Sequence, residues 1–283
     1  MSAISPLRYP GGKAKLYTTV KNIITANELT GGIYAEPFAG GAGLALKLLL
    51  KNDVDKIILN DLDLAIYSFW DEILHNNSAF TEKINNTMIT IEEWYNQKSI
   101  YANPQNHSKL DYAFATFFLN RTNMSGVIKG GVIGGTMQQG KYKIDARFNK
   151  NDLIERIKNI ALHKDKIEIH NEDGAIFAKK IEQQYPKALI NFDPPYVQKG
   201  GALYKNSFNE DAHRLLSEYI LKCSNKWILT YDVCSLIDKL YSSKRHSLID
   251  ITYSAQNKRK AKEFIFFSDN VYIPNDIISE SEG

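Results

Sequence analysis

Residues 33–52, IYAEPFAGGAGLALKLLLKN, place a short apolar run, a cluster of glycines and a helical pattern in immediate succession. The run at 33–38 has the length of a buried strand, and apolar side chains then recur at helical spacing from Leu44 onward. Glycines between such elements allow a tight turn and a close approach of the backbone to a ligand. The stretch predicts a strand, a turn and a helix, which is the first unit of an α/β fold.

The same alternation continues along the chain. Strands are predicted at 56–61, 166–171, 188–192 and 226–231, with helices from about 174, at 209–223 and at 233–241. Two final strands, 247–254 and 262–268, follow each other without a helix between them. Repeated strand–helix units imply a mostly parallel sheet covered on both faces, and the final pair implies an antiparallel hairpin at one edge.

Residues 62–159 interrupt this alternation. The part at 62–118 is mostly helical in pattern, and the part at 124–148 contains six glycines and is typical of an irregular hairpin or a long loop. A helical pattern returns at 149–164. We therefore expect one domain formed by 1–61 and 160–283, and an inserted domain at 62–159.

Composition places the chain among ordinary globular proteins. It has 283 residues, of which 43% are hydrophobic and 24% charged, which excludes the disordered and fibrous classes. We find no apolar run of about 18 residues and no secretory stretch at the N-terminus, so we expect a cytoplasmic protein with no membrane partner. The two cysteines, Cys223 and Cys234, have no partner at metal-ligand spacing, so we expect no metal site.

Basic residues gather in two segments although the net charge is only +3. Residues 120–160 contain eight basic and three acidic side chains, and QNKRKAK at 256–262 forms a second cluster. Such segments are either solvated faces or surfaces for a polyanion, and both interpretations stay open.

The glycine turn is compatible with a nucleoside ligand. Gly40, Gly41 and Gly43 are too closely spaced for the usual dinucleotide motif. Asp61 ends the next strand about 20 residues further on, where an acidic side chain holds ribose hydroxyls in nucleotide-binding folds. Glu36 stands where the ammonium group of a methionine-like ligand could pair with it. Plain packing glycines are the alternative.

A second decisive stretch is INFDPPYVQKGG at 190–201, where an apolar strand runs into two prolines. Each proline lacks an N–H and restricts the residue before it to extended conformations, so the strand stops near Asp193. Asp193 and the Pro194 carbonyl could accept both N–H groups of an amine on a base ring and so localise its lone pair. Tyr196 could stack on that ring, which contributes about 1–3 kcal/mol per base. A loop with a buried tyrosine is the structural alternative.

These stretches together resemble the Dam-type family of DNA adenine-N6 methyltransferases, the class in which target recognition lies between the glycine motif and DPPY. The resemblance spans roughly 6–268. It is carried by RYPGGKAKL (8–16), EPFAGGAG (36–43), LND (59–61), FFLNRTNMSGVIKGGVIGG (117–135), YKIDARFNK (142–150), FDPPY (192–196) and LYKNSF (203–208). DPPY alone is shared with several amino-methylating families.

The resemblance implies a Rossmann-like methyltransferase sheet that binds S-adenosylmethionine, with an inserted recognition domain. Phe38, Gly40, Gly41 and Gly43 would line the cofactor pocket. Glu36 would face the methionine moiety, Asp61 the ribose and Asp173 the adenine of the cofactor. The implied motif that folds over the cofactor and the catalytic pocket comprises Tyr9, Gly11, Gly12 and Lys13.

The resemblance also implies the chemistry. Asp193, Pro194 and Tyr196 match the catalytic tetrapeptide, in which Pro195 would chiefly hold the shape, and Asp193 also borders the cofactor. The target adenine would be flipped out of duplex DNA and its amine would displace the sulfonium methyl directly, without a metal.

DNA binding is assigned to the insert. Base edges and phosphates would be contacted by Asn120, Arg121, Asn123, Ser125 and Lys129, because Arg reads guanine and Asn reads adenine. Lys141, Lys143 and Arg147 would contact phosphates, which position a protein without specifying sequence. Duplex DNA is thus the expected partner of a monomer or weak dimer, and a cognate restriction endonuclease is a further candidate. The recognition sequence is not assigned.

Rival functions remain. Methylation of cytosine N4 is disfavoured because those enzymes tend towards serine at the position of Asp193, and protein-glutamine methylation because those enzymes show asparagine there. An RNA base amine is another possible acceptor. A silent DNA-binding module has no need of Asp193, Tyr196 and the glycine turn together. The glycine spacing and the elbow argue against a dinucleotide oxidoreductase.

Overall fold

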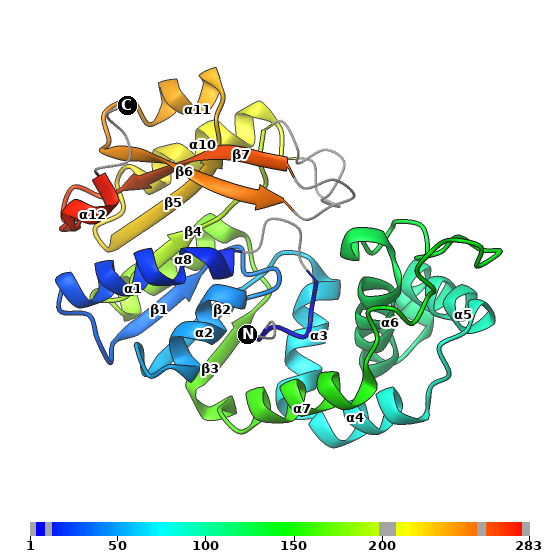
Figure 1. Ribbon diagram of the computed structural model, residues 1–283. Helices are drawn as coiled ribbons and strands as arrows, with labels where there is room; N and C mark the ends of the chain where they lie inside the picture. The colour runs from blue at the N-terminus through cyan, green and yellow to red at the C-terminus, as the bar shows by residue number, and fades with distance from the viewer. Residues whose placement is uncertain (1–3, 9–12, 198–207, 254–258, 279–283) are drawn as a thin grey trace. The chain divides into compact units, whose positions relative to one another are not determined.

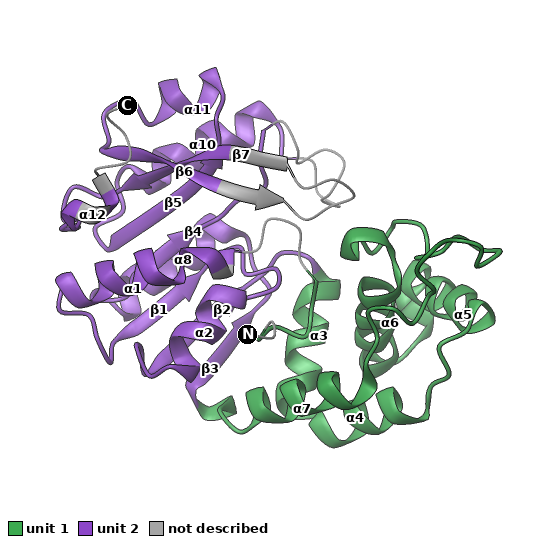
Figure 2. Cartoon of the chain, in the orientation of Figure 1, with its two compact units in different colours: residues 1–11, 64–165, 254–258 green, residues 12–63, 166–253, 259–283 purple. Residues whose placement is uncertain are grey.

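The computed structural model describes residues 4–8, 13–197, 208–253 and 259–278. The chain forms two compact units, each of which is described by itself. In Figure 2 the sheet unit, shown in purple, comprises 12–63, 166–253 and 259–283, and the helical unit, shown in green, is built mainly from 64–165. The sequence predicted an inserted domain at 62–159.

The sheet unit is organised by seven strands in the order β3-β2-β1-β4-β5-β7-β6. Their bounds are β1 Ile33–Glu36, β2 Lys56–Asn60, β3 Ile167–His170, β4 Leu189–Phe192, β5 Lys226–Asp232, β6 His246–Tyr253 and β7 Arg259–Phe267. The pairs β1–β2, β2–β3, β1–β4 and β4–β5 are parallel, whereas β7 runs antiparallel to both β5 and β6 (Figure 1). The predicted mostly parallel sheet with an antiparallel hairpin at one edge is confirmed.

The strand order reverses between β1 and β4. From β1 the chain proceeds outward to β2 and β3, and from β4 it proceeds in the opposite direction to β5. In open α/β sheets, ligands bind outside the carboxyl ends of the strands at such a switch point. β1 ends at Glu36 and β4 ends one residue before Asp193, so the two motifs found in the sequence meet at this point.

The sheet unit contains the following helices. They are η1 Lys13–Leu16, α1 Tyr17–Ala26, α2 Gly43–Leu50, η4 Lys164–Lys166 at the junction, α8 Gly174–Gln184, α10 Glu210–Ile220, α11 Ser235–Leu240 and α12 Asn275–Ile278. α1 packs with α2, and α8 packs with α10. One core cluster joins Phe177 of α8 and Leu216 of α10 to Ile190, Phe192 and Trp227 of the central strands.

The helical unit is built around aromatic side chains. Its helices are α3 Leu64–His75, α4 Asn77–Asn86, α5 Ile91–Ala102, η2 Pro104–Asn106, α6 Lys109–Thr122, η3 Met124–Gly126 and α7 Lys150–Ala161. Phe69 and Phe117 stack with their ring centroids 5.8 Å apart, and Phe80 and Phe148 meet the Phe117 ring edge-on. Phe69, Phe80 and Phe117 are fully buried, so the packing of these rings forms the core of the helical unit.

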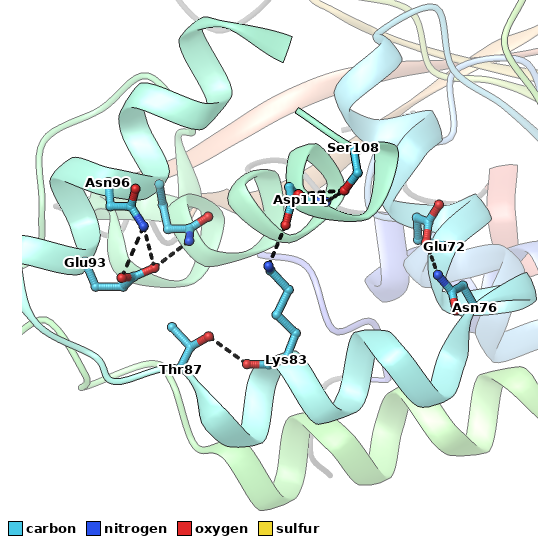
Figure 3. A network of polar contacts seen from close by, with 9 residues as sticks. Glu72, Asn76, Lys83, Thr87, Glu93, Asn96, Ser108 and Asp111 are labelled. Carbon is cyan, nitrogen blue, oxygen red and sulfur yellow. Dashed lines mark hydrogen bonds and ion pairs between the residues drawn. The ribbon is translucent and has the colours of Figure 1, made fainter. Parts of the chain in front are cut away.

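Polar contacts define the ends of these helices (Figure 3). The side chain of Thr90 accepts a hydrogen bond from the Glu93 amide at the start of α5, and Ser108 accepts one from the Asp111 amide at the start of α6. Asp111 also receives Lys83 Nζ at 2.6 Å, which links α4 to α6. None of the helices in the described part of the chain is long and apolar enough to cross a membrane.

Candidate active site

Asp193 is the centre of the candidate site. Its Oδ1 accepts from Thr230 Oγ1 at 2.8 Å, lies 2.9 Å from Lys13 Nζ and lies 3.2 Å from the Tyr196 hydroxyl. All the donors recorded for this carboxylate thus meet one oxygen. The side chain is 24% exposed, so the site is open on one side. The arrangement orients the carboxylate, and within the described part of the chain no donor meets Oδ2.

Glu263 of β7 shares two of these donors. Its Oε2 accepts from the Tyr196 hydroxyl at 2.7 Å and lies 3.4 Å from Lys13 Nζ, which also donates to the Tyr196 hydroxyl at 2.5 Å. The Glu263 side chain is 0% exposed and that of Lys13 is 5% exposed. Buried charges are tolerated when they are paired and hydrogen-bonded, and here both are.

The pKa values of this pair follow from burial and mutual attraction. Burial lowers the pKa of Lys13, but the charges of Asp193 and Glu263 and their hydrogen bonds outweigh it and raise that pKa above the ordinary value. Burial raises the pKa of Glu263, against the opposing effect of Lys13. Lys13 therefore stays charged at neutral pH.

Strand β5 holds the elbow from the other side. Thr230 bonds to Asp193, and Asp232, two residues further along the same strand, accepts from the Val197 amide at 3.1 Å. Residues i and i+2 of a strand point to the same face, so both contacts come from one face of β5. The stiff segment between Asp193 and Val197 is thus tied at both ends.

The glycine turn is held by residues at the end of β2. Gly40 and Ala42 adopt left-handed backbone, with φ of 47° and 46°. The amides of Gly40 and Asp63 donate to the two oxygens of Asp61, each at 2.9 Å. Burial raises the pKa of Asp61 to about 6, although both amides oppose the shift. Gly41 lies within the turn and Gly43 begins α2.

Glu36 ends β1 as a buried carboxylate. It is 5% exposed, and the hydroxyl of Tyr34 donates to its Oε1 at 3.0 Å. Burial raises the pKa of Glu36 to about 8, and the nearby negative charge of Asp193 adds to this. The donor bonds and Lys13 oppose the shift. Such a carboxylate favours a cationic ligand, because a positive charge restores its ionised form.

Phe38 lies against Gly174 at the start of α8. A Cβ built on Gly174 would meet the Phe38 ring at 2.5 Å, so a side chain at this position would require the ring to move. Asp173, the preceding residue, caps the helix by accepting from the amides of Ala175 and Ile176 through Oδ1. Asp173 and Gly174 follow β3, whereas Phe38 follows β1, so the two segments approach each other at the carboxyl edge of the sheet.

Two asparagines predicted to contact DNA lie in the interior of the helical unit. Asn120 is 1% exposed and binds the backbone of Arg8 through both ends of its amide. Asn123 is 0% exposed, accepts from Trp94 Nε1 at 2.7 Å and donates to the carbonyls of Val127 and Ile128. Both side chains shape the loop that follows α6, and contact with a base would require these bonds to open.

Arg121 lies in a cluster of guanidinium groups. Its Nε donates to the carbonyl of Arg147 at 2.7 Å. Burial lowers the pKa of Arg121 to about 10, and the charges of Arg8, Arg156 and Arg147 act in the same direction. Asp152 opposes them and pairs with Arg156 at 2.7 Å. The cluster carries an excess of positive charge that suits an anionic ligand.

The other residues predicted to contact DNA are more accessible. Lys129, Lys141, Lys143 and Arg147 are exposed, and Ser125 is half-buried with a left-handed φ of 58°. Lys143 donates to the carbonyl of Gln138, whose side chain organises the loop by bonding to Ile133, Gly135 and Ile144. Tyr142 is 57% exposed, with Lys141 and Arg147 near its ring.

Several residues of the site were not predicted from the sequence, and some predicted residues lie outside the part of the chain that the structure describes. Thr230, Asp232, Glu263 and Gly174 were not predicted, although a glutamate inside the buried apolar run KEFIFF is a signal that could have found Glu263. Tyr9, Gly11 and Gly12 lie outside the described residues. Pro194 is buried and Pro195 half-buried in the elbow. No cluster of three His, Cys, Asp or Glu side chains suited to a metal occurs among the residues described.

Comparison with known proteins gives a family and two relatives. A family model for D12 class N6 adenine-specific DNA methyltransferases matches residues 9–256. A type II methyltransferase of Methanocaldococcus jannaschii is 21% identical over 238 residues, which cover 78% of this chain and 80% of the relative. A type II methyltransferase of Paramecium bursaria Chlorella virus NC1A is 23% identical over 249 residues, which cover 87% and 90%.

We predict that Gly174→Ala destabilises the sheet unit by about 1–3 kcal/mol, because the new methyl group overlaps the Phe38 ring. Thermal unfolding followed by circular dichroism measures the loss. Gly131→Ala is the control, since a methyl group there meets only Met124 Cε at 3.8 Å. Equal midpoints for the two variants would show that the Phe38 ring moves away without cost.

Proposed function

Because the chain belongs to the D12 class of N6 adenine-specific DNA methyltransferases, we propose that it methylates the N6 amine of an adenine in duplex DNA, with S-adenosylmethionine as methyl donor. The observation that carries this proposal is that, among the described residues, Asp193 is contacted only at Oδ1, by Thr230, Lys13 and Tyr196. The second oxygen of an oriented carboxylate is then available to an amine N–H. We propose that the reaction takes place at the elbow that follows β4, at the switch point of the sheet.

The cofactor is assigned to the carboxyl ends of β1, β2 and β3. Glu36 would pair with the ammonium group, Asp61 would accept from the ribose, and Asp173 with Phe38 would hold the adenine. Gly40, Gly41 and Gly43 would let the backbone approach the ligand. S-adenosylmethionine supplies a methyl group attached to a positively charged sulfonium.

The residues present fit such a ligand. Glu36 is a buried carboxylate whose pKa is raised to about 8, so a cationic partner is energetically favoured beside it. The Phe38 ring lies directly against Gly174 because residue 174 has no side chain. Asp61 uses each oxygen for one backbone amide, and each carboxylate oxygen can accept a further hydrogen bond.

The chain's contribution to catalysis is positioning and electrostatics. Asp193 Oδ2 and the Pro194 carbonyl accept from the target amine, which localises its lone pair for attack on the methyl group. The Tyr196 side chain is 8% exposed, so a base can contact it only by entering the site. We therefore propose that the adenine is flipped out of the duplex. Holding the reacting atoms in line supplies most of the rate enhancement.

The helical unit is proposed to bind the duplex. Its exposed Lys129, Lys141, Lys143 and Arg147 offer phosphate contacts, and the cluster around Arg121, to which Arg147 belongs, adds positive charge. We propose that the half-buried Ser125 belongs to this surface. The buried Asn120 and Asn123 would hold the loop that carries it. A cognate restriction endonuclease is a proposed functional partner, because the two relatives are named as type II methyltransferases.

We expect Asp193→Ala to reduce methyl transfer to adenine by at least about 10³-fold, because the acceptor for the target amine is lost. Affinity for S-adenosylmethionine and for DNA should change little. Transfer of a radioactive methyl group in single turnover measures the rate, with the exposed Asp238→Ala as the matched control. Turnover near the wild-type rate would refute the role of Asp193.

Cofactor binding should release a proton at neutral pH. Glu36, with its pKa raised to about 8, is mostly protonated at pH 7 before the ammonium group arrives. Binding should therefore release most of one proton at pH 7 and less as the pH rises past the pKa of Glu36, and affinity should rise as the pH increases towards 8. Calorimetry in buffers of different ionisation enthalpy counts the protons. Glu36→Gln should abolish the release, and a wild-type binding heat independent of buffer would contradict the assignment.

Replacing both Lys141 and Lys143 by Gln should weaken binding to every duplex sequence. Each lost phosphate contact lowers the slope of log K against log salt by about 0.9, so the pair should lower it by about 2. Fluorescence anisotropy at several salt concentrations measures this. Lys179→Gln with Lys187→Gln, two exposed lysines of the sheet unit, is the control. A loss confined to some sequences would mean that the two lysines read bases.

A further inference from the structure

We propose that Thr230 is a positioning residue for methyl transfer, which together with Asp232 holds the elbow (residues 193–197) in the shape that directs Asp193 Oδ2 at the target amine. The inference rests on the proposed function and extends it to strand β5. Thr230 is completely buried and Asp232 is 4% exposed. Both side chains therefore act through the elbow and do not touch the substrate.

The two prolines deprive the elbow of backbone donors. Pro194 and Pro195 have no N–H, so neither can donate a hydrogen bond to a neighbouring strand. The pairing of β4 with β5 extends to Phe192, which lies opposite Leu229, and the elbow begins at the next residue. Side chains must therefore supply the bonds that fix the position of the elbow.

Strand β5 supplies such a bond at each end of the elbow. Thr230 directly follows Leu229, and its Oγ1 donates to Asp193 Oδ1 at 2.8 Å. Asp232 Oδ1 accepts from the Val197 amide at 3.1 Å. Thr230 and Asp232 are two residues apart in a strand, so their side chains point to the same face of the sheet. The two bonds thus span the elbow from a single strand.

Strand β5 is itself held on both sides. It pairs with β4 along one edge and with β7 along the other, where Thr230 lies opposite Ile265 and Asp232 opposite Glu263. Threonine is branched at Cβ, which restricts rotation of its side chain about the first torsion. The direction of the Thr230 hydroxyl is therefore determined by the backbone of the sheet.

The groups that meet Asp193 Oδ1 differ in how well they can orient it. Lys13 donates to the Tyr196 hydroxyl at 2.5 Å, and both groups also contact a second carboxylate. The Thr230 hydroxyl lies 3.5 Å from the Phe192 carbonyl but only 2.8 Å from Asp193, so its proton is directed to the carboxylate. Because this hydroxyl is neutral, its removal tests orientation without changing the formal charge of the site.

The test measures methylation of duplex DNA in single turnover with saturating cofactor. Valine has nearly the volume of threonine but no hydroxyl, so Thr230→Val should slow transfer about 10–100-fold, because the carboxylate is no longer held in line. Affinities for the cofactor and for DNA should stay within about twofold of the wild type, since neither ligand touches this side chain. Thr230→Ser keeps the hydroxyl and should recover most of the wild-type rate.

Thr116→Val is the matched control for the loss of a buried hydroxyl. Thr116 is also completely buried, and its Oγ1 donates to the Tyr112 carbonyl at 2.9 Å within α6 of the helical unit. The substitution removes a comparable hydrogen bond far from the elbow in sequence and within the other unit. Its thermal unfolding reports the cost in stability, and its rate of transfer should equal that of the wild type.

Asp232 provides a second test at the other end of the elbow, which decides the matter if Thr230→Val fails to fold. Asp232→Asn keeps an oxygen that can accept from the Val197 amide, whereas Asp232→Leu removes it. We expect Asp232→Leu to slow transfer without loss of cofactor or DNA affinity, and Asp232→Asn to stay closer to the wild type.

A wild-type rate in Thr230→Val, or in Asp232→Leu where the valine variant does not fold, would overturn the inference. So would a rate in Thr230→Ser as low as in Thr230→Val, because the loss would then follow packing instead of the hydroxyl. A loss confined to cofactor or DNA affinity would overturn it as well. A wild type that binds the cofactor and duplex DNA without methylating adenine would instead refute the proposed function, whatever the variants do.

Discussion

The candidate site depends on how the Asp193 carboxylate is bound. Three polar groups from three different parts of the chain meet Oδ1, and they come from η1, β5 and the elbow itself. A carboxylate bound in this way cannot rotate freely, so its other oxygen, Oδ2, is held in a fixed orientation. Because each donor is held in turn by a buried partner, the geometry is a property of the assembled sheet rather than of the short motif around Asp193.

The sheet topology explains why these donors meet. β7 lies between β5 and β6, antiparallel to both, and so carries Glu263 next to Asp232 and close to the end of β4. The same topology places Glu36 at the end of β1 beside the elbow, since β1 and β4 are neighbours at the switch point. Lys13 reaches the cluster from the start of η1. Residues 250 positions apart in sequence thus form one ion pair.

The sequence predicted the parts of the site that depend on local patterns. The strand, glycine turn and helix at 33–52 and the proline elbow after Phe192 have local causes, and the structure contains them at those positions. Residue type and spacing do not reveal which way a side chain points. Asn120 and Asn123 have side chains that could recognise bases, but both lie in the interior. There their side-chain amides form hydrogen bonds with backbone carbonyl groups. Glu263 and Thr230 were missed because their partners are distant in sequence.

The account centres on adenine N6 in DNA as the methyl acceptor at the Asp193 elbow. The most direct test is single-molecule sequencing, with modified-base detection, of plasmid DNA from a methylation-free host that expresses the protein. We predict N6-methyladenine at one recurring sequence motif. Unmodified plasmid, recovered from cells in which the protein is folded and binds S-adenosylmethionine, would contradict the account and indicate a different acceptor such as RNA.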